Sequence, residues 1–225
     1  MTKIRTQLAG RSRFDRIAYG FGRNTVVGFC LTWTRLRVEG KQHVPKEGIF
    51  ILAPTHRSIL DTPIASAVTR RRMRFMGADK WWKNKWFGRL LTVFGGFPVT
   101  RGSADREALR RCIDVLEGGE PLVLFPEGER KSGPEVQPLF DGAAYIAAKT
   151  GAPIVPVGIG GSERVMPKGA KFIRPKKVWA IVGEPIPAPT GATLKEQREA
   201  ARVVTHQLHA RLQDLFDEAQ RKAGA

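Results

Sequence analysis

Short apolar segments alternate with segments of helical periodicity along this chain. The apolar segments lie at residues 49–54, 73–78, 121–128, 152–161 and 176–186. The helical patterns lie at residues 14–37, 62–71, 80–96, 103–120, 143–151 and 193–222. Strands that alternate with helices form a sheet with helices packed on it. The sequence therefore predicts an α/β fold with a mixed, largely parallel sheet flanked by helices, an N-terminal amphipathic helical segment and a long C-terminal helix.

The length of 225 residues suits one domain with a core of its own. We divide it into an N-terminal membrane-associated helical segment (1–38), an α/β domain (39–192) and a C-terminal helix packed on the same domain (193–225). The two cysteines, Cys30 and Cys112, fit neither a metal site nor a disulfide framework, so we expect both to be buried and reduced. The basic start lacks an apolar core and a cleavage site, so we expect no signal peptide.

The charge of the chain restricts its partners more than its fold. Lys and Arg number 38 against 21 Asp and Glu, a formal net charge of +17. Nucleic acid, an anionic membrane and phosphorylated substrates are the partners that such a charge suits. A basic nucleic-acid-binding protein is thus one candidate class, but the chain has no helix-turn-helix pattern, zinc spacing or RNA-recognition signature. We therefore expect no nucleic-acid partner.

The stretch LAPTHRSILDTP, residues 52–63, contains His56 and, five positions later, Asp61. Residues five apart on a straight helix are about 140° apart, so these side chains can meet only if His56 lies in a turn and the chain curls back. A histidine with a carboxylate partner is a general base near neutral pH. The alternative is an ordinary helix start, because Ser58 and Asp61 also have the spacing of a capping box.

Two further stretches place polar residues after turns. GGFPVTRG (95–102) contains Arg101, and LFPEGERKSG (124–133) contains Glu127, Gly128 and Arg130. Glycine lets a backbone approach a ligand closely, and the planar fork of arginine suits a phosphate. Taken singly, each stretch also fits a solvated arginine or an ion pair within a turn.

Taken together, HRSILD, GGFPVTR, FPEGER and APIVPV, in this order over residues 56–157, resemble the glycerophospholipid acyltransferase family. These are the 1-acylglycerol-3-phosphate acyltransferases (PlsC-like enzymes) and their relatives. The family has a His-x4-Asp block, a block ending in Arg, a Phe-Pro-Glu-Gly-(Thr/Ser)-Arg block and an apolar block with prolines. The resemblance implies transfer of an acyl group from an acyl thioester to the free hydroxyl of 1-acylglycerol 3-phosphate, giving phosphatidic acid in phospholipid synthesis.

The resemblance also implies a role for each block. His56 takes the proton of the acceptor hydroxyl and Asp61 orients His56. The residues implied to bind the acceptor phosphate are Arg101, Glu127, Gly128 and Arg130, and those implied to form the acyl pocket are Ile154, Val155 and Pro156. The co-substrate is acyl-CoA or acyl carrier protein, and neither a metal, another cofactor nor a covalent acyl-enzyme is expected.

One residue departs from the family pattern, because Glu129 stands where Thr or Ser is usual. A carboxylate that faced a phosphate would repel it. We therefore predict that Glu129 faces away, towards Lys131.

Two alternatives for the reaction stay open. The acceptor could be glycerol 3-phosphate or another lysophospholipid, and a thioester hydrolase would use water in place of an acceptor. A hydrolase would not need a phosphate clamp at Arg101 and Arg130.

The substrates implied are amphiphiles, so we expect a monotopic or peripheral protein on the cytoplasmic face of the membrane. The expected contacts are residues 14–37 and 80–94, where KWWKNKWFGR interleaves Lys and Arg with Trp81, Trp82, Trp86 and Phe87. The alternative for 80–94 is a core helix with a basic outer face. Residues 70–74 and 168–177 add basic surface. The uncharged stretch 24–34 would span only about 16 Å as a helix, too little to cross a membrane.

Overall fold

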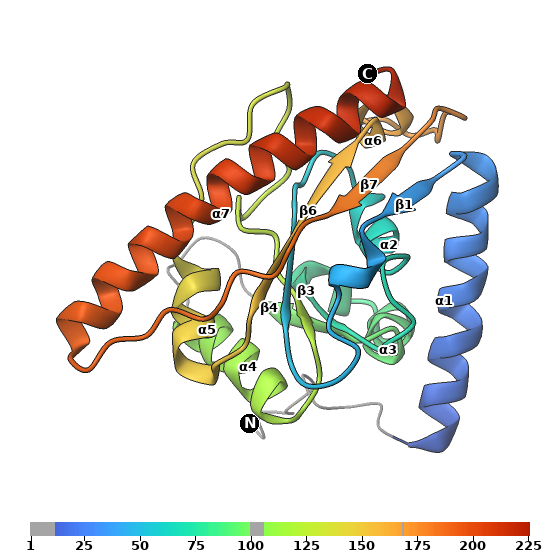
Figure 1. Cartoon of the computed structure of the whole chain (residues 1–225). Coiled ribbons are helices and arrows are strands. Elements are labelled where there is room, and N and C mark those ends of the chain that lie inside the picture. The colour runs from blue at the N-terminus through green and yellow to red at the C-terminus, as the bar shows by residue number, and fades with distance from the viewer. Residues whose placement is uncertain (1–11, 100–105, 168) are drawn as a thin grey trace.

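The computed structural model describes residues 12–99, 106–167 and 169–225, and its centre is one sheet (Figure 1). Within these residues the sheet has seven strands in the order β1-β7-β6-β2-β5-β3-β4. Their bounds are β1 Arg37–Glu39, β2 Ile51–Pro54, β3 Arg74–Ala78, β4 Gly96–Val99, β5 Leu122–Val123, β6 Ile154–Gly160 and β7 Trp179–Val182. Neighbouring strands run parallel except β6 and β7, which pair antiparallel. The predicted α/β fold with a mixed, largely parallel sheet is confirmed.

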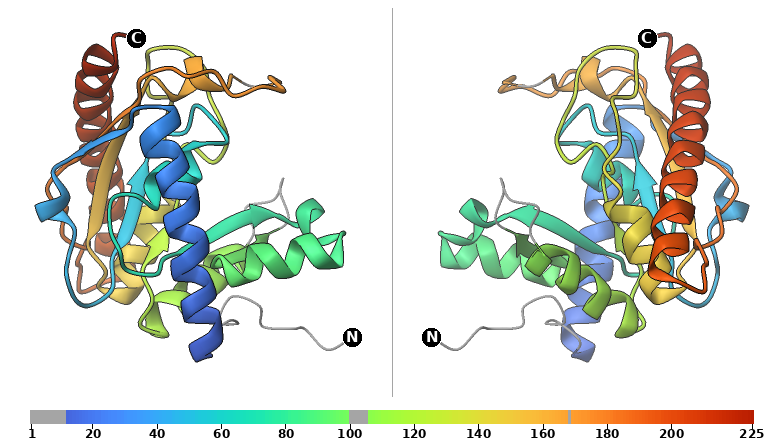
Figure 2. Two further views of the ribbon diagram at one scale, coloured as in Figure 1. Left: turned by 90° about the vertical axis from the view of Figure 1, so that its right-hand side faces the viewer. Right: turned by 90° about the vertical axis from the view of Figure 1, so that its left-hand side faces the viewer.

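Helices cover both faces of this sheet (Figure 2). The helices are α1 Arg13–Trp33, α2 Asp61–Ala65, α3 Lys85–Val93, α4 Arg106–Glu117, α5 Gly142–Thr150, α6 Ser162–Val165 and α7 Leu194–Ala223, with 3-10 turns η2 Lys41–His43 and η3 Asp79–Trp82. One buried cluster joins α1 and α2 to the sheet, and a second joins α4, α5 and α7 to it. Because side chains alternate along a strand, neighbouring residues of β6 enter different clusters.

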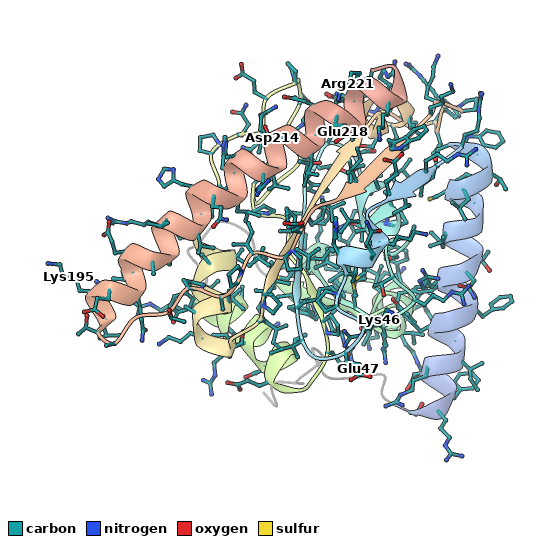
Figure 3. All side chains as sticks on the ribbon, in the orientation of Figure 1. Lys46, Glu47, Lys195, Asp214, Glu218 and Arg221 are labelled. Atoms are coloured by element: carbon teal, nitrogen blue, oxygen red, sulfur yellow. The ribbon has the colours of Figure 1, made fainter. Side chains whose placement is uncertain are left out.

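Helix α7 lies diagonally across the sheet, directly on β6 (Figure 1). Two glycines of β6 allow this contact. A Cβ on Gly158 would lie 2.2 Å from the carbonyl carbon of Leu215, and one on Gly160 would lie 2.2 Å from that of Ala219. Several charged residues of α7 are exposed to solvent, among them Lys195, Asp214 and Arg221, which are labelled in Figure 3. The backbone of α7 therefore rests against the backbone of β6.

The helix predicted over residues 14–37 ends earlier, at Trp33, and a strand follows it. The backbone N–H and the hydroxyl of Thr34 both donate to the carbonyl of Cys30, at 3.1 and 2.6 Å. Arg35 then adopts a positive φ of 47°, and Arg37 begins to pair with the β7 side of the sheet by donating to the Val178 carbonyl. The apolar pattern missed β1 because the strand has only three residues.

The helix predicted over residues 80–96 is wrong in a similar way, because η3, α3 and the start of β4 divide this range. Gly95 ends α3 with a φ of 85°, a conformation that favours glycine. The strand that follows includes Pro98, which lacks an N–H for sheet pairing. β4 tolerates it because it is an edge strand with one partner, β3.

Both cysteines are free and buried, as predicted. Burial raises the pKa of Cys30 to about 11 and that of Cys112 to about 12. In the part of the chain that the structure describes, no helix is long and apolar enough to cross a bilayer. The same described residues contain no group of three or more His, Cys, Asp or Glu side chains that could hold a metal ion.

We predict that Gly158→Ala lowers the free energy of unfolding by about 1–3 kcal/mol, because the new methyl group has to push α7 away from β6. Chemical denaturation measures this change. Gly20→Ala is the matched control, since a Cβ there meets nothing within 4 Å. It should be neutral or stabilising by up to about 1 kcal/mol. Equal stability of the two variants would show that α7 does not rest on β6 as described.

Candidate functional site

The loops that follow β2 and β5 form the candidate site. These strands are hydrogen-bonded neighbours that run parallel, so residues 55–61 and 124–133 leave the sheet side by side at its carboxyl edge. The backbone N–H of Lys131 donates to the carbonyl of His56 at 2.9 Å and ties the two loops together. Ligand sites of open α/β sheets usually lie at this edge.

The predicted approach of His56 and Asp61 is confirmed. His56 Nδ1 lies 3.1 Å from Asp61 Oδ2. Asp61 is fully buried, while the His56 side chain keeps 13% of its surface exposed. The chain curls back between them, with Asp61 as the first residue of the short helix α2.

The same carboxylate oxygen also holds the loop closed. Asp61 Oδ2 accepts the backbone N–H groups of Arg57 and Ser58, each at 2.6 Å. The bond from Ser58 N–H is one of the two that a capping box makes. The reciprocal bond is missing, because Asp61 N–H donates to the Ser58 carbonyl and Ser58 Oγ donates to the Met166 carbonyl. The two interpretations of this stretch are therefore not exclusive, because one oxygen caps the turn and contacts the histidine.

These contacts define how His56 is presented. Asp61 Oδ2 already accepts two N–H groups, so we assign a proton to Nδ1 of His56, which then donates the third bond. In this tautomer Nε2 carries a free lone pair. The ring stacks on Phe125, with ring centroids 3.9 Å apart and planes inclined by 22°. A histidine held in this way can accept a proton at Nε2.

Glu127 has protein partners where the sequence had suggested a ligand. Its side chain is fully buried. Oε1 accepts the backbone N–H of His56 at 3.1 Å and Nη1 of Arg57 at 2.8 Å. Oε2 accepts the same Nη1 at 2.9 Å and the backbone N–H of Gln137 at 3.1 Å. The carboxylate of Glu127 thus faces the loop of His56.

The other residues of this turn lie nearer the surface. Gly128 has a φ of 74°, and a Cβ there would lie 2.7 Å from the ring of Phe140, so both backbone and packing require glycine. Glu129 is exposed and pairs with Lys131 at 2.9 Å, as predicted. Arg130 is half-buried, and no described residue forms an ion pair with it. Arg101 lies outside the described residues.

The expected acyl-pocket residues lie in the interior of the sheet. Ile154, Val155 and Pro156 are consecutive and buried on β6, paired with β2. Val155 belongs to the core cluster of α1 and α2, and Ile154 to that of α4, α5 and α7. They support the sheet beside the site, and their part in an acyl pocket stays a prediction.

Arg57 is a component of the site that the sequence did not reveal. Its side chain is only 1% exposed, although arginine is almost never fully buried without a partner. The composition of the loop gives no signal for this burial, since an arginine beside a histidine usually lies in solvent. Its partners become visible only when the two loops are placed together.

The expected membrane contacts fall into two groups. Trp86 is 83% exposed, and Trp81 and Phe87 are also exposed, with ring centroids 5.8 Å apart. Trp82 is instead half-buried, donates from Nε1 to Thr92 Oγ1 at 3.0 Å and packs against Gly88. Trp82 therefore offers less surface to a membrane than expected, because part of its ring packs between η3 and α3.

The basic run at residues 70–74 also contributes less surface than expected. Arg71 donates to the carbonyls of Pro45 and Gly48, and Arg72 to that of Val93. Arg74 is fully buried and ion-paired with Glu120. Of these arginines only Arg70 is exposed.

Two features define the class of the protein. One is the histidine–carboxylate pair at the carboxyl edge of a mixed α/β sheet, and the other is the Phe-Pro-Glu-Gly turn that follows it in the chain. The family described as Acyltransferase matches residues 35–160. The chain belongs to this family.

Individual relatives carry a more specific name. The 1-acyl-sn-glycerol-3-phosphate acyltransferase of Bacillus subtilis is 29% identical over 181 residues, covering 80% of this chain and 87% of the relative. The enzyme of that name from Streptococcus pneumoniae is 29% identical over 152 residues, covering 64% of this chain and 54% of the relative. The crystal structure of the 1-acyl-sn-glycerophosphate acyltransferase PlsC of Thermotoga maritima has a TM-score of 0.68 at 26% identity, covering 91% of this chain and 84% of that one.

We predict that Asp61→Ala lowers the free energy of unfolding by at least about 2 kcal/mol, because it leaves two buried backbone N–H groups without an acceptor. Asp61→Asn keeps one oxygen and should cost less. Asp141→Ala is the control, since this exposed helix-start residue caps nothing with its side chain. It should change stability by less than about 0.5 kcal/mol. Denaturant titration compares the three, and a loss no larger for Asp61→Ala than for the control would contradict the closed loop.

Proposed function

We propose that this chain transfers a fatty acyl group from an acyl thioester to the free hydroxyl of 1-acylglycerol 3-phosphate, giving phosphatidic acid. The observation that carries the proposal is the contact between His56 Nδ1 and Asp61 Oδ2 at 3.1 Å, at the surface end of the β2 loop. The names of the relatives from Bacillus subtilis and Thermotoga maritima support the acceptor. The acyl donor is acyl-CoA or acyl carrier protein, and no other cofactor is required.

The reaction needs a base at the acceptor hydroxyl. We propose that Nε2 of His56 takes the hydroxyl proton as the oxygen attacks the carbonyl carbon of the thioester. The imidazolium that forms is stabilised by Asp61, which holds the opposite nitrogen. When the carbon–sulfur bond breaks, the imidazolium returns the proton to the thiolate. The ester and a free thiol leave, and the histidine is again neutral.

The acceptor phosphate needs a cation close to the base. We propose Arg130, which no described residue pairs with and which follows the Gly128 turn beside the His56 loop. Arg101 is proposed on sequence grounds as a second phosphate ligand. A planar guanidinium binds two phosphate oxygens at once, so it fixes the orientation of the acceptor as well as its position.

We predict that His56→Ala lowers the rate of acceptor-dependent thiol release from palmitoyl-CoA by at least about a hundredfold, the usual range for removal of a general base. The wild-type protein is assayed in detergent with and without 1-acylglycerol 3-phosphate. His206→Ala removes an exposed imidazole from α7, away from the loops of the site, and should retain activity within about threefold.

The same assay separates the rival functions. Release that does not need an acceptor identifies a hydrolase. Release with glycerol 3-phosphate or another lysophospholipid, but not with 1-acylglycerol 3-phosphate, replaces the proposed acceptor. If no acceptor gives release, the proposal fails.

We further propose that the protein binds the cytoplasmic face of the cell membrane as a peripheral or monotopic protein, through α1 and α3. Phe14, Ile17 and Phe21 of α1 are 72–77% exposed, although they share one apolar side of that helix. The buried side of α1 is a different one, formed by Tyr19, Val27 and Cys30. An apolar side that faces away from the core needs an apolar environment outside the protein.

Two neighbouring segments extend this surface. Helix α3 contacts α1 and carries the exposed Trp86 among lysines. At the other end of α1, Trp33 donates from Nε1 to the carbonyl of Ile173, beside Phe172, which is 81% exposed. Figure 2 shows α3 and the loop before β7 projecting to the same side of the sheet. Aromatic rings among cationic side chains favour the headgroup zone of anionic membranes.

We predict that Phe21→Ser with Trp86→Ser lowers binding to phosphatidylglycerol vesicles by at least about tenfold, because each ring contributes on the order of 1–2 kcal/mol when it enters the interface. Val203→Ser is the control. Its side chain is 61% exposed on α7, which covers the opposite face of the sheet. Co-flotation measures binding, and equal losses in both variants would contradict the proposed surface.

A further inference from the structure

Arg57 and Glu127 form an ion pair in the interior, directly behind the backbone of His56. Arg57 Nη1 lies 2.8 Å from Glu127 Oε1, and the side chains are 1% and 0% exposed. Taking two charges out of water costs several kcal/mol per ion, and an apolar pair of the same volume is often as stable. Stability alone therefore does not explain why charges occupy this position.

The contacts of Arg57 join three parts of the chain. Besides Glu127, its guanidinium donates to the carbonyls of Gly133 at 3.2 Å and Glu135 at 2.9 Å. It also lies 4.7 Å from the centre of the Phe216 ring on α7. The side chain thus links the loop after β2 to the loop after β5 and to the long helix that rests on β6.

His56 is fixed on both sides of its peptide backbone by the same pair. Its N–H donates to Glu127 Oε1 at 3.1 Å, and its carbonyl accepts Arg57 Nη1 at 3.1 Å. The backbone N–H of Arg57 also donates to Asp61 Oδ2, the oxygen that holds the imidazole. The backbone of His56 and the orientation of its ring are therefore set by one connected group of hydrogen bonds.

We propose that Arg57 and Glu127 are positioning residues that hold His56 in place for proton transfer and do not themselves contact the acceptor. This proposal rests on the proposed function and adds to it a residue that the sequence did not single out. It also gives Glu127 a different task from the substrate contact implied by the family resemblance. A displacement of about 1 Å at a reacting group can lower the rate by about a hundredfold. The pair therefore affects kcat by keeping His56 at the right distance from the acceptor hydroxyl.

The test compares Arg57→Met/Glu127→Leu with the wild type and with a matched control. Arg74 and Glu120 form another ion pair, with exposures of 0% and 17%, at the amino ends of β3 and β5 and so at the edge of the sheet opposite His56. Arg74→Met/Glu120→Leu is therefore a control for losing an ion pair with a buried arginine elsewhere in the sheet. Circular dichroism first establishes a temperature at which all variants are folded, and kcat and acceptor KM are measured there.

The positioning role predicts that kcat of Arg57→Met/Glu127→Leu falls by at least about a hundredfold while acceptor KM changes less than about threefold. The control pair should keep kcat within about threefold. Glu127→Gln retains an oxygen for the His56 N–H and should recover part of kcat. Retained kcat in the folded double variant would overturn the proposal, and so would a raised KM with unchanged kcat, which indicates contact with the acceptor. If the double variant does not fold, the same two criteria apply to Arg57→Lys, which keeps a charge beside Glu127 but cannot donate to Glu127 and to the His56, Gly133 and Glu135 carbonyls at once.

A second measurement separates this proposal from the proposed function. The nitrogen chemical shifts of the His56 imidazole should show the Nδ1-protonated tautomer in the wild type and a mixture of tautomers in Arg57→Met/Glu127→Leu. If the wild type transfers no acyl group to any acceptor, the proposed function fails, and a mixture in the variant still supports positioning. An unchanged tautomer in that case would refute positioning as well.

Discussion

The site depends on one buried oxygen, Oδ2 of Asp61, which accepts three N–H groups. Two of them belong to the backbone of Arg57 and Ser58 and the third to the imidazole of His56. A buried carboxylate is tolerated only where such donors surround it. The loop therefore closes around the charge, and the closure presents the histidine at the carboxyl edge of the sheet. One oxygen thus serves both the fold and the chemistry. It accepts the backbone N–H groups that close the turn, and it accepts the Nδ1 proton of His56, which fixes the tautomer of the base.

Much of this arrangement was predictable from local patterns. Alternating apolar and helical segments gave the α/β class. The five-residue spacing of His56 and Asp61 showed only that the two can meet if the chain curls back, and the family resemblance implied that they do. Two strands were missed: β1 has only three residues, and β4 begins at Gly96, which falls within the range predicted as a helix. The end of α1 depends on Thr34 and Arg35, whose conformations follow from how the chain enters the sheet.

The site was predictable in its types of residue but not in their partners. Sequence order suggested that Glu127 contacts a ligand, whereas its carboxylate lies against the backbone of His56. Arg57 gave no signal, because burial of a charge is decided by loops that are 70 residues apart in sequence. The tryptophans show the same limit. Trp82 and Trp86 stand in one basic, aromatic stretch, yet one packs among glycines and the other is exposed, and only the turn between η3 and α3 separates their roles.

His56 is held in place before any substrate binds. Its ring stacks on Phe125, and hydrogen bonds hold its peptide groups. The ring and the loop are ordered by contacts inside the protein, with 13% of the side chain left exposed. Folding alone then sets the position of the base, and each new substrate meets a loop that is already in place. A reaction cycle at this site then needs no movement of the histidine into place.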